Sequence, residues 1–84
     1  MGQPEVKIYS TPTCSGCDAA KEFLRQRGIP FYEYNVAKDL EAAERMIKRT
    51  GQTAVPVIEV GDAVIVGFDR RRLEKALAQD GLAA

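Results

Sequence analysis

The sequence contains no histidine and no tryptophan, and its 84 residues include only two cysteines, Cys14 and Cys17. Without histidine, the Cys–His pair of cysteine proteases and the mixed Cys/His zinc sites are excluded. Two cysteines also cannot supply the four protein ligands of a closed zinc site built from thiolates alone. The chemistry that remains open to this chain is therefore thiol chemistry.

Net charge and long apolar runs are missing as well. The 12 Lys and Arg side chains balance the 12 Asp and Glu side chains, which argues against nucleic acid or an anionic membrane as the main partner. No segment approaches the roughly 20 apolar residues of a membrane span. Residues 1–5 have neither the basic region nor the apolar region of a secretory signal. The myristoylation pattern also fails, because Val6 stands where Ser or Thr is required. We therefore expect a cytoplasmic protein, in which a disulfide is usually transient and catalytic.

The length predicts one domain, residues 1–84, with a loose tail from about 80 to 84. Hydrophobic periodicity and β-forming residues predict strands at about 5–9, 31–36, 55–60 and 63–66. Helices are predicted between the turn at 10–13 and Gly28, from about 40 to 50 after the capping residue Asp39, and from about 70 to 79 after Asp69. The side chains expected in the core are Cys17, Ala20, Phe23, Leu24, Phe31, Tyr34, Leu40, Ala43, Ile47, Leu73, Ala76 and Leu77.

The order of these elements, β-α-β-α-β-β-α, predicts an α/β fold. A strand–helix–strand crossover gives a parallel pair, and the Gly61-Asp62 turn gives an antiparallel hairpin. We therefore expect a four-stranded mixed sheet flanked by three helices, with helices on both of its faces.

Cys14 and Cys17 form a Cys-x-x-Cys motif where the first strand passes into the first helix. At a helix start, Cys14 would face unsatisfied N–H groups and the positive end of the helix dipole, which favour the reactive thiolate. Residues three apart share one helix face and lie close enough for a disulfide. We predict that Cys14, the outer thiol, is the nucleophile, and that Cys17, part of the buried stripe, resolves the mixed disulfide. Three other interpretations of the motif remain: a structural disulfide, half of a metal site completed by another chain, and two unrelated core thiols.

The segment Thr53-Ala54-Val55-Pro56 opens the third strand. In the predicted topology it lies beside the start of the first helix, next to Cys14. A cis bond before Pro56 would turn the N–H and C=O groups of Val55 toward an extended substrate. The alternative is a strand that simply begins with proline, as sheets accept.

The segment Gly67-Phe68-Asp69 precedes the last helix. We interpret its residues as a turn glycine, an apolar contact and an N-cap. The next three residues, 70–72, are all arginine, and positive charge at a helix start opposes the dipole. These arginines form either a solvated face or a basic rim for glutathione carboxylates or an acidic protein surface.

The motifs together resemble the glutaredoxin family over nearly the whole chain. Residues 10–17, 53–56 and 66–69 stand in the order and spacing of that family, and the chain looks most similar to small bacterial glutaredoxin-like proteins of the YruB and NrdH type. The resemblance implies a thioredoxin-like fold, a cis-proline at Pro56 and Cys14 as the nucleophile. It also implies a substrate- or glutathione-binding set, which comprises Thr53, Val55, Pro56, Gly67, Phe68 and Asp69.

The sequence departs from the family pattern around the motif. Ser15 and Gly16 replace the common Pro-Tyr or Pro-Phe pair, so the aromatic side chain that leans over glutathione is missing. Thr11 stands in place of a common Lys or Arg, and Val66 replaces the first glycine of a Gly-Gly pair. These departures leave thioredoxin reductase as an alternative to glutathione as the electron donor.

We therefore predict a monomeric enzyme, a dithiol thiol–disulfide oxidoreductase that reduces protein or glutathione-mixed disulfides. It needs no metal and no tightly bound cofactor, and its electrons come from glutathione or thioredoxin reductase. The main alternative is an iron–sulfur carrier, in which two chains hold a cluster through Cys14 and glutathione. A third interpretation is a passive redox sensor inside a larger assembly.

Overall fold

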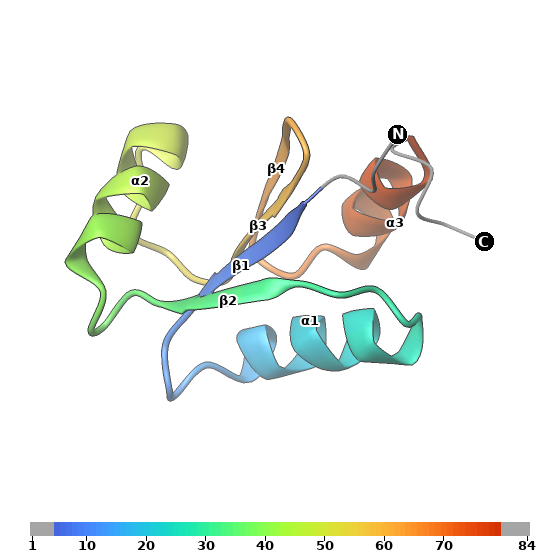
Figure 1. The fold of residues 1–84 in the computed structure, drawn as a ribbon, viewed down its shortest axis with the longest axis horizontal. Helices are drawn as coiled ribbons and strands as arrows, with labels where there is room; N and C mark the ends of the chain where they lie inside the picture. The colour runs from blue at the N-terminus through green and yellow to red at the C-terminus, as the bar shows by residue number, and fades with distance from the viewer. Residues whose placement is uncertain (1–4, 80–84) are drawn as a thin grey trace.

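The computed structural model describes residues 5–79, and its elements follow the predicted order (Figure 1). They are β1 (Val6–Ser10), α1 (Ser15–Gln26), β2 (Tyr32–Asn35), α2 (Leu40–Thr50), β3 (Val57–Val60), β4 (Ala63–Val66) and α3 (Arg70–Gln79). The tail expected at 80–84 lies outside the described residues. None of the helices within residues 5–79 is long and apolar enough to cross a membrane.

The four strands form one mixed sheet in the order β2-β1-β3-β4. Strand β1 pairs in parallel with β2, and it pairs antiparallel with β3. Strand β4 returns antiparallel to β3 through the Gly61-Asp62 turn. The thioredoxin-like β-α-β-α-β-β-α fold predicted from the sequence is therefore confirmed, and β1 stands at its centre with its carboxyl end leading into the Cys-x-x-Cys motif.

Helices α1 and α3 cover one face of the sheet and build the larger core. Their buried side chains interlock with those of β1, β3 and β4, because alternate strand residues point to the same face. This cluster comprises Val6, Ile8, Ala20, Phe23, Leu24, Ile29, Ile58, Val60, Ile65, Leu73, Ala76 and Leu77. The core stripes predicted for the first and last helices are confirmed.

Helix α2 covers part of the opposite face, and here the sequence prediction is wrong. The predicted stripe was Leu40, Ala43 and Ile47, whereas the structure buries Ala42 and Met46 against Tyr9 and Val57. Leu40 is 74% exposed and Ile47 is 42% exposed, and Ala43 is half-buried. Both apolar stripes have helical spacing, so tertiary packing decides between them. In the turn before α2, the Asn35 carbonyl accepts from the Lys38 and Asp39 N–H groups.

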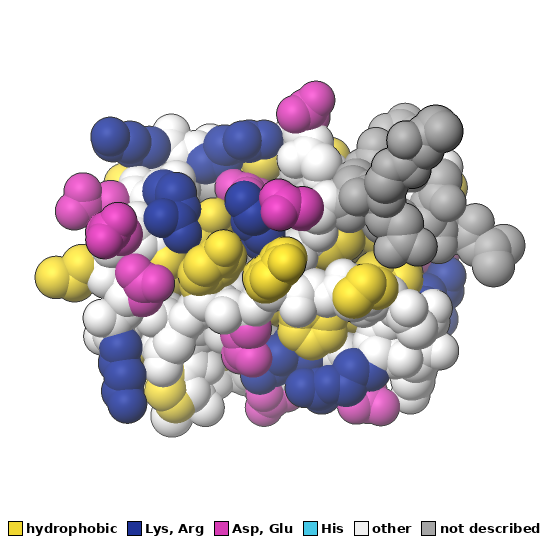
Figure 2. Space-filling view, viewed as in Figure 1, with side chains coloured by type: hydrophobic (Ala, Val, Ile, Leu, Met, Phe, Trp, Pro, Cys, Tyr) yellow, Lys and Arg dark blue, Asp and Glu magenta, His cyan; other side chains and the backbone are white. Residues whose placement is uncertain are grey.

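Two strands are shorter than predicted. Strand β2 occupies Tyr32–Asn35 rather than 31–36, and it lies at the front of the view in Figure 1. Figure 2 shows hydrophobic side chains along this edge, bordered by charged ones, and Tyr32 is 61% exposed. Strand β3 begins at Val57 rather than 55, because Pro56 has no N–H to give to a β-ladder. Phe31 and Tyr34 are partly buried against the larger and smaller clusters respectively.

Candidate active site

Cys14 is the N-cap of α1, which explains how the sequence places a sulfur atom at a helix start. Its backbone is extended, and its Sγ accepts a hydrogen bond from the Cys17 N–H at 3.1 Å. The Cys14 carbonyl accepts from the Asp18 N–H, also at 3.1 Å. Sulfur therefore takes the place that a Ser or Asp oxygen fills in most caps.

Cys14 and Cys17 are joined by a disulfide, with their Cα atoms 5.2 Å apart. The two thiols are thus paired and are not unrelated core residues. Their surroundings differ: Cys14 is half-buried, whereas Cys17 is 0% exposed and lies on the buried stripe of α1. Cys17 is therefore closed to another molecule in the oxidised protein, whereas part of Cys14 is exposed.

Pro56 lies against the first turn of α1. A Cβ atom added to Gly16 would stand 3.4 Å from Pro56 Cδ, so the start of β3 and the Cys-x-x-Cys motif are in close contact. The Val55–Pro56 peptide bond is cis, as the family resemblance implies. Val55 is half-buried and packs on the smaller cluster, while Thr53 is exposed.

The segment 67–69 is tied to the same place. The Gly67 N–H donates to the Pro56 carbonyl at 2.7 Å, and Gly67 has a φ of 84° that favours glycine. The Phe68 ring meets the Phe23 ring edge-on, with centroids 5.9 Å apart. Asp69 caps α3, because its Oδ1 accepts from the Arg72 N–H at 3.1 Å. These are the three structural roles expected from the sequence.

The arginines at the start of α3 are partly neutralised by neighbouring carboxylates. Arg70 Nε lies 3.3 Å from Glu74 Oε1, and Arg72 Nε lies 3.5 Å from Asp69 Oδ2. Arg71 forms no ion pair with any residue in the described range 5–79. The salt bridges reduce the positive charge that opposes the helix dipole.

Comparison with known proteins identifies the family. The glutaredoxin family model matches residues 6–65. The chain belongs to the glutaredoxin family. It is 42% identical over 72 residues to a glutaredoxin-like 8.6 kDa protein from the rubredoxin operon of Clostridium pasteurianum, covering 86% of this chain and 96% of that protein. It is 39% identical over 64 residues to glutaredoxin 3 of Escherichia coli K12, covering 76% of this chain and 77% of that protein.

A solved structure gives the same family and fold. NrdH-redoxin from Escherichia coli, a glutaredoxin-like protein with a thioredoxin-like activity profile, superposes with a TM-score of 0.76. The two chains share 31% identity, with 84% of this chain and 92% of the other covered. The protein is thus a glutaredoxin-like thiol–disulfide oxidoreductase with a redox-active Cys14–Cys17 disulfide.

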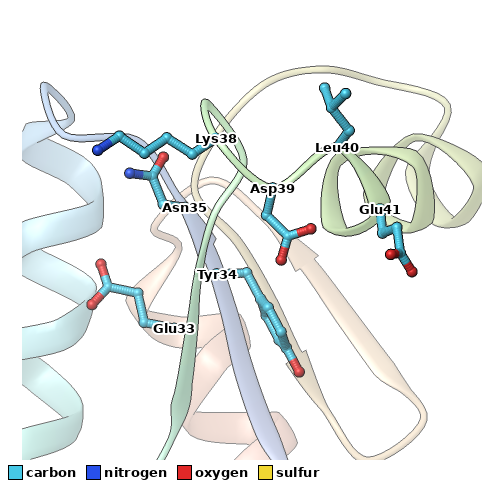
Figure 3. A pocket seen from close by; sticks show the side chains of 7 residues that line it. All are labelled: Glu33, Tyr34, Asn35, Lys38, Asp39, Leu40 and Glu41. Atoms are coloured by element: carbon cyan, nitrogen blue, oxygen red, sulfur yellow. The ribbon is translucent and has the colours of Figure 1, made fainter.

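A polar network that joins β1, α1 and β2 was not foreseen from the sequence of this glutaredoxin. The Ser10 hydroxyl donates to Glu33 Oε2 at 2.8 Å, and the Lys21 ammonium donates to the same oxygen at 2.8 Å. Ser10 is 2% exposed, and Figure 3 shows Glu33 extending toward α1 while Tyr34 points to the other face. Its three residues lie far apart in the sequence, so the pairing across β1, α1 and β2 depends on the fold.

The network shifts both of its charged groups away from their ordinary values. The hydrogen bond from Lys21, and next the one from Ser10, lower the pKa of Glu33. The hydrogen bond to Glu33 raises the pKa of Lys21, against the opposing effect of burial. Both groups are therefore held in their charged forms.

The depression at the start of α2, drawn in Figure 3, is a separate feature. It is lined by Glu33, Tyr34, Asn35, Lys38, Asp39, Leu40 and Glu41, so neither cysteine borders it. Within the described part of the chain, no three His, Cys, Asp or Glu side chains are grouped to hold a metal ion.

Proposed function

We propose that this glutaredoxin reduces protein disulfides and glutathione-mixed disulfides by a dithiol mechanism, with Cys14 as nucleophile and Cys17 as resolving thiol. The observation that carries the proposal is the asymmetry of the pair. Cys14 is half-buried at the helix start, and Cys17 is fully buried one turn further along. The outer sulfur can meet a partner, and the inner sulfur can meet only Cys14.

The reaction consists of two exchanges at sulfur. The Cys14 thiolate attacks one sulfur of the target disulfide, a mixed disulfide forms, and the other target sulfur leaves as a thiolate. The Cys17 thiolate then attacks the Cys14 sulfur, which forms the Cys14–Cys17 disulfide and releases the second target thiolate. Two electrons pass from the cysteine pair to the target, and a donor thiol must restore the reduced pair.

The substrate lies, in this proposal, along the Val55–Pro56 segment and the start of α3. Pro56 contacts the first turn of α1, and an extended substrate could pair with the Val55 backbone as an added strand. The family resemblance adds Thr53, Gly67, Phe68 and Asp69 as glutathione contacts. Asp69 already accepts from the α3 backbone, so any contact with a ligand amine has to use its remaining acceptor capacity.

The electron donor is glutathione or thioredoxin reductase. Similarity to glutaredoxin 3 supports the first donor, and similarity to a redoxin with a thioredoxin-like activity profile supports the second. The absence of an aromatic residue between the cysteines favours a protein donor, because glutathione loses one contact surface. We place the protein in the cytoplasm as a monomer.

A coupled assay tests the proposal. NADPH consumption is followed with a disulfide substrate, in one series with glutathione and its reductase and in the other with thioredoxin reductase. Turnover is expected in at least one series, and its absence from both would defeat the proposed function. Visible absorbance and dimerisation after anaerobic reconstitution with iron and sulfide would instead support the iron–sulfur carrier.

Two cysteine variants test the division of roles. Cys14→Ser is expected to abolish turnover in both series. Cys17→Ser is expected to retain reduction of glutathione-mixed disulfides, which needs one thiol, and to lose dithiol reduction of protein disulfides. The reverse pattern would exchange the two assignments.

A further inference from the structure

Resolution of the mixed disulfide poses a specific chemical problem in this protein. The attacking group is Cys17, which is 0% exposed, and burial in apolar surroundings disfavours a thiolate. The helix cap that helps Cys14 does not serve Cys17, because its own N–H is the donor to Cys14 Sγ. A positive group near the start of α1 would favour the Cys17 thiolate.

We propose that Ser10, Glu33 and Lys21 are positioning residues for this step, and that they hold the Lys21 ammonium one helical turn from Cys17, where its charge favours the attacking thiolate. The inference rests on the proposed dithiol function. Residues four apart on a helix are neighbours, with Cβ atoms about 5–6 Å apart. Lys21 Nζ also lies 3.6 Å from Asp18 Oδ1, which shows that the side chain leans back toward the first turn.

The geometry of the network restrains the lysine. Glu33 Oε2 accepts from Lys21 and from Ser10, both at 2.8 Å, and Ser10 is the last residue of β1. Ordering a lysine side chain costs about 2 kcal/mol of rotamer entropy. The hydrogen bonds from Lys21 to Glu33 and from Ser10 to Glu33 oppose that cost and hold the ammonium in one place. The side chain is only 16% exposed, which limits screening of that charge by solvent.

The neighbouring charges determine how large the effect can be. Lys21 faces Glu33 from β2 and Asp18 from its own helix, and Arg25 adds a weaker positive charge near Glu33. The two carboxylates oppose a thiolate and offset the ammonium in the wild-type protein. Removing Lys21 alone leaves both carboxylates without their positive partner, so the predicted change has one direction, toward a less favoured Cys17 thiolate.

The two exchange steps can be separated in one experiment. Reduced full-length protein is mixed rapidly with an excess of a chromogenic aromatic disulfide, which releases a coloured thiolate at each step. Attack by Cys14 gives a first phase whose rate rises with reagent concentration. Attack by Cys17 on the Cys14 sulfur gives a second phase whose rate does not depend on reagent concentration, and its pH profile reports the ionisation of Cys17.

Lys21→Met is expected to move the midpoint of the second-phase profile to higher pH by about half to one unit, which is about three- to tenfold slower resolution at neutral pH. The first phase should change by less than about twofold. Lys21→Arg should restore the second-phase profile, because it retains the charge. Lys48→Met, which removes an exposed positive charge from α2, is the matched control and should leave both phases unchanged.

An unshifted second phase in Lys21→Met, or equal profiles for the Met and Arg variants, would overturn the inference. If the wild-type protein shows neither the first nor the second phase, the dithiol function itself is contradicted. If Lys21→Met does not fold, Ser10→Ala provides the test, since it keeps the lysine and removes one anchor of Glu33. It should move the second-phase midpoint upward by a smaller amount, and an unchanged midpoint there would equally refute the role.

Discussion

Substitution of Met46 by Ala tests the face that α2 presents to the sheet. Met46 is 2% exposed and packs in the smaller cluster with Tyr9, Ala42 and Val57. Truncating a buried Met to Ala costs about 2–5 kcal/mol, depending on how well the site collapses. The smaller cluster is bordered by partly buried side chains that can move inward, so we expect a loss of about 2–3 kcal/mol.

Leu40→Ala is the matched control, because it removes a side chain of similar size from the other stripe of the same helix. Leu40 is 74% exposed, so its truncation should change the free energy of unfolding by less than about 0.5 kcal/mol. For a chain of this size, the loss at Met46 corresponds to a melting temperature lower by about 10–20 °C.

Urea unfolding of the oxidised protein, followed by far-ultraviolet circular dichroism, measures both variants. The method suits a chain without tryptophan. Equal slopes with denaturant concentration would show that the midpoints report stability alone. A cost for Leu40→Ala equal to or larger than that for Met46→Ala would refute the burial of the Ala42–Met46 stripe. Since Val55 packs on the same cluster, Met46→Ala should also reduce disulfide reductase turnover.

Three further changes probe caps, charge and contact. Asp39→Ala removes the carboxylate that accepts from the Ala42 N–H at 3.1 Å and should cost about 1 kcal/mol in urea unfolding, because an N-cap is lost; an unchanged midpoint would contradict the cap. Because the pKa of Glu33 is lowered, chiefly by Lys21, the stability advantage of wild type over Glu33→Gln should be complete above the unfolded carboxyl value of about 4.3. It should disappear as the pH falls through the lower folded pKa, whereas an advantage that grows in acid would reverse the sign. Gly16→Ala should stabilise by about 0.4–1 kcal/mol, since the added methyl meets Pro56 at an ordinary contact distance of 3.4 Å; a lower melting temperature would show that Pro56 does not accommodate it.

The parts of the fold that the sequence predicts are those in which local patterns and chain topology agree. The apolar stripes of the first and last helices have one strong face each, and turn residues separate every strand. The Cys-x-x-Cys motif could be placed because the strand before it and the helix after it were both evident. The position of Pro56 beside that motif follows from topology, since β3 pairs with β1 in an antiparallel sense.

The remaining features depend on interactions between distant segments. Helix α2 carries two apolar stripes, and nothing local distinguishes Met46 from Ile47 as the buried residue. The link from Ser10 to Glu33 spans 23 residues, and it forms only because Ile8 and Glu33 are partners in the β1–β2 register. A polar residue on an expected strand gives no local sign that its partner is a lysine of the preceding helix.

The capping role of Cys14 joins the redox chemistry to folding through a thermodynamic cycle. The sulfur that accepts the Cys17 N–H is also the atom that changes from disulfide to thiolate during turnover. A charged acceptor forms the stronger hydrogen bond, so the folded chain favours the thiolate over the disulfide sulfur at this position. The cycle compares the folded chain with the unfolded chain, in the oxidised and the reduced form. A difference of about 1.4 kcal/mol between the unfolding free energies of the two forms shifts the reduction potential by about 30 mV. Unfolding free energies of the oxidised and reduced forms would thus measure how oxidising the fold makes its cysteine pair, without any partner protein in the assay.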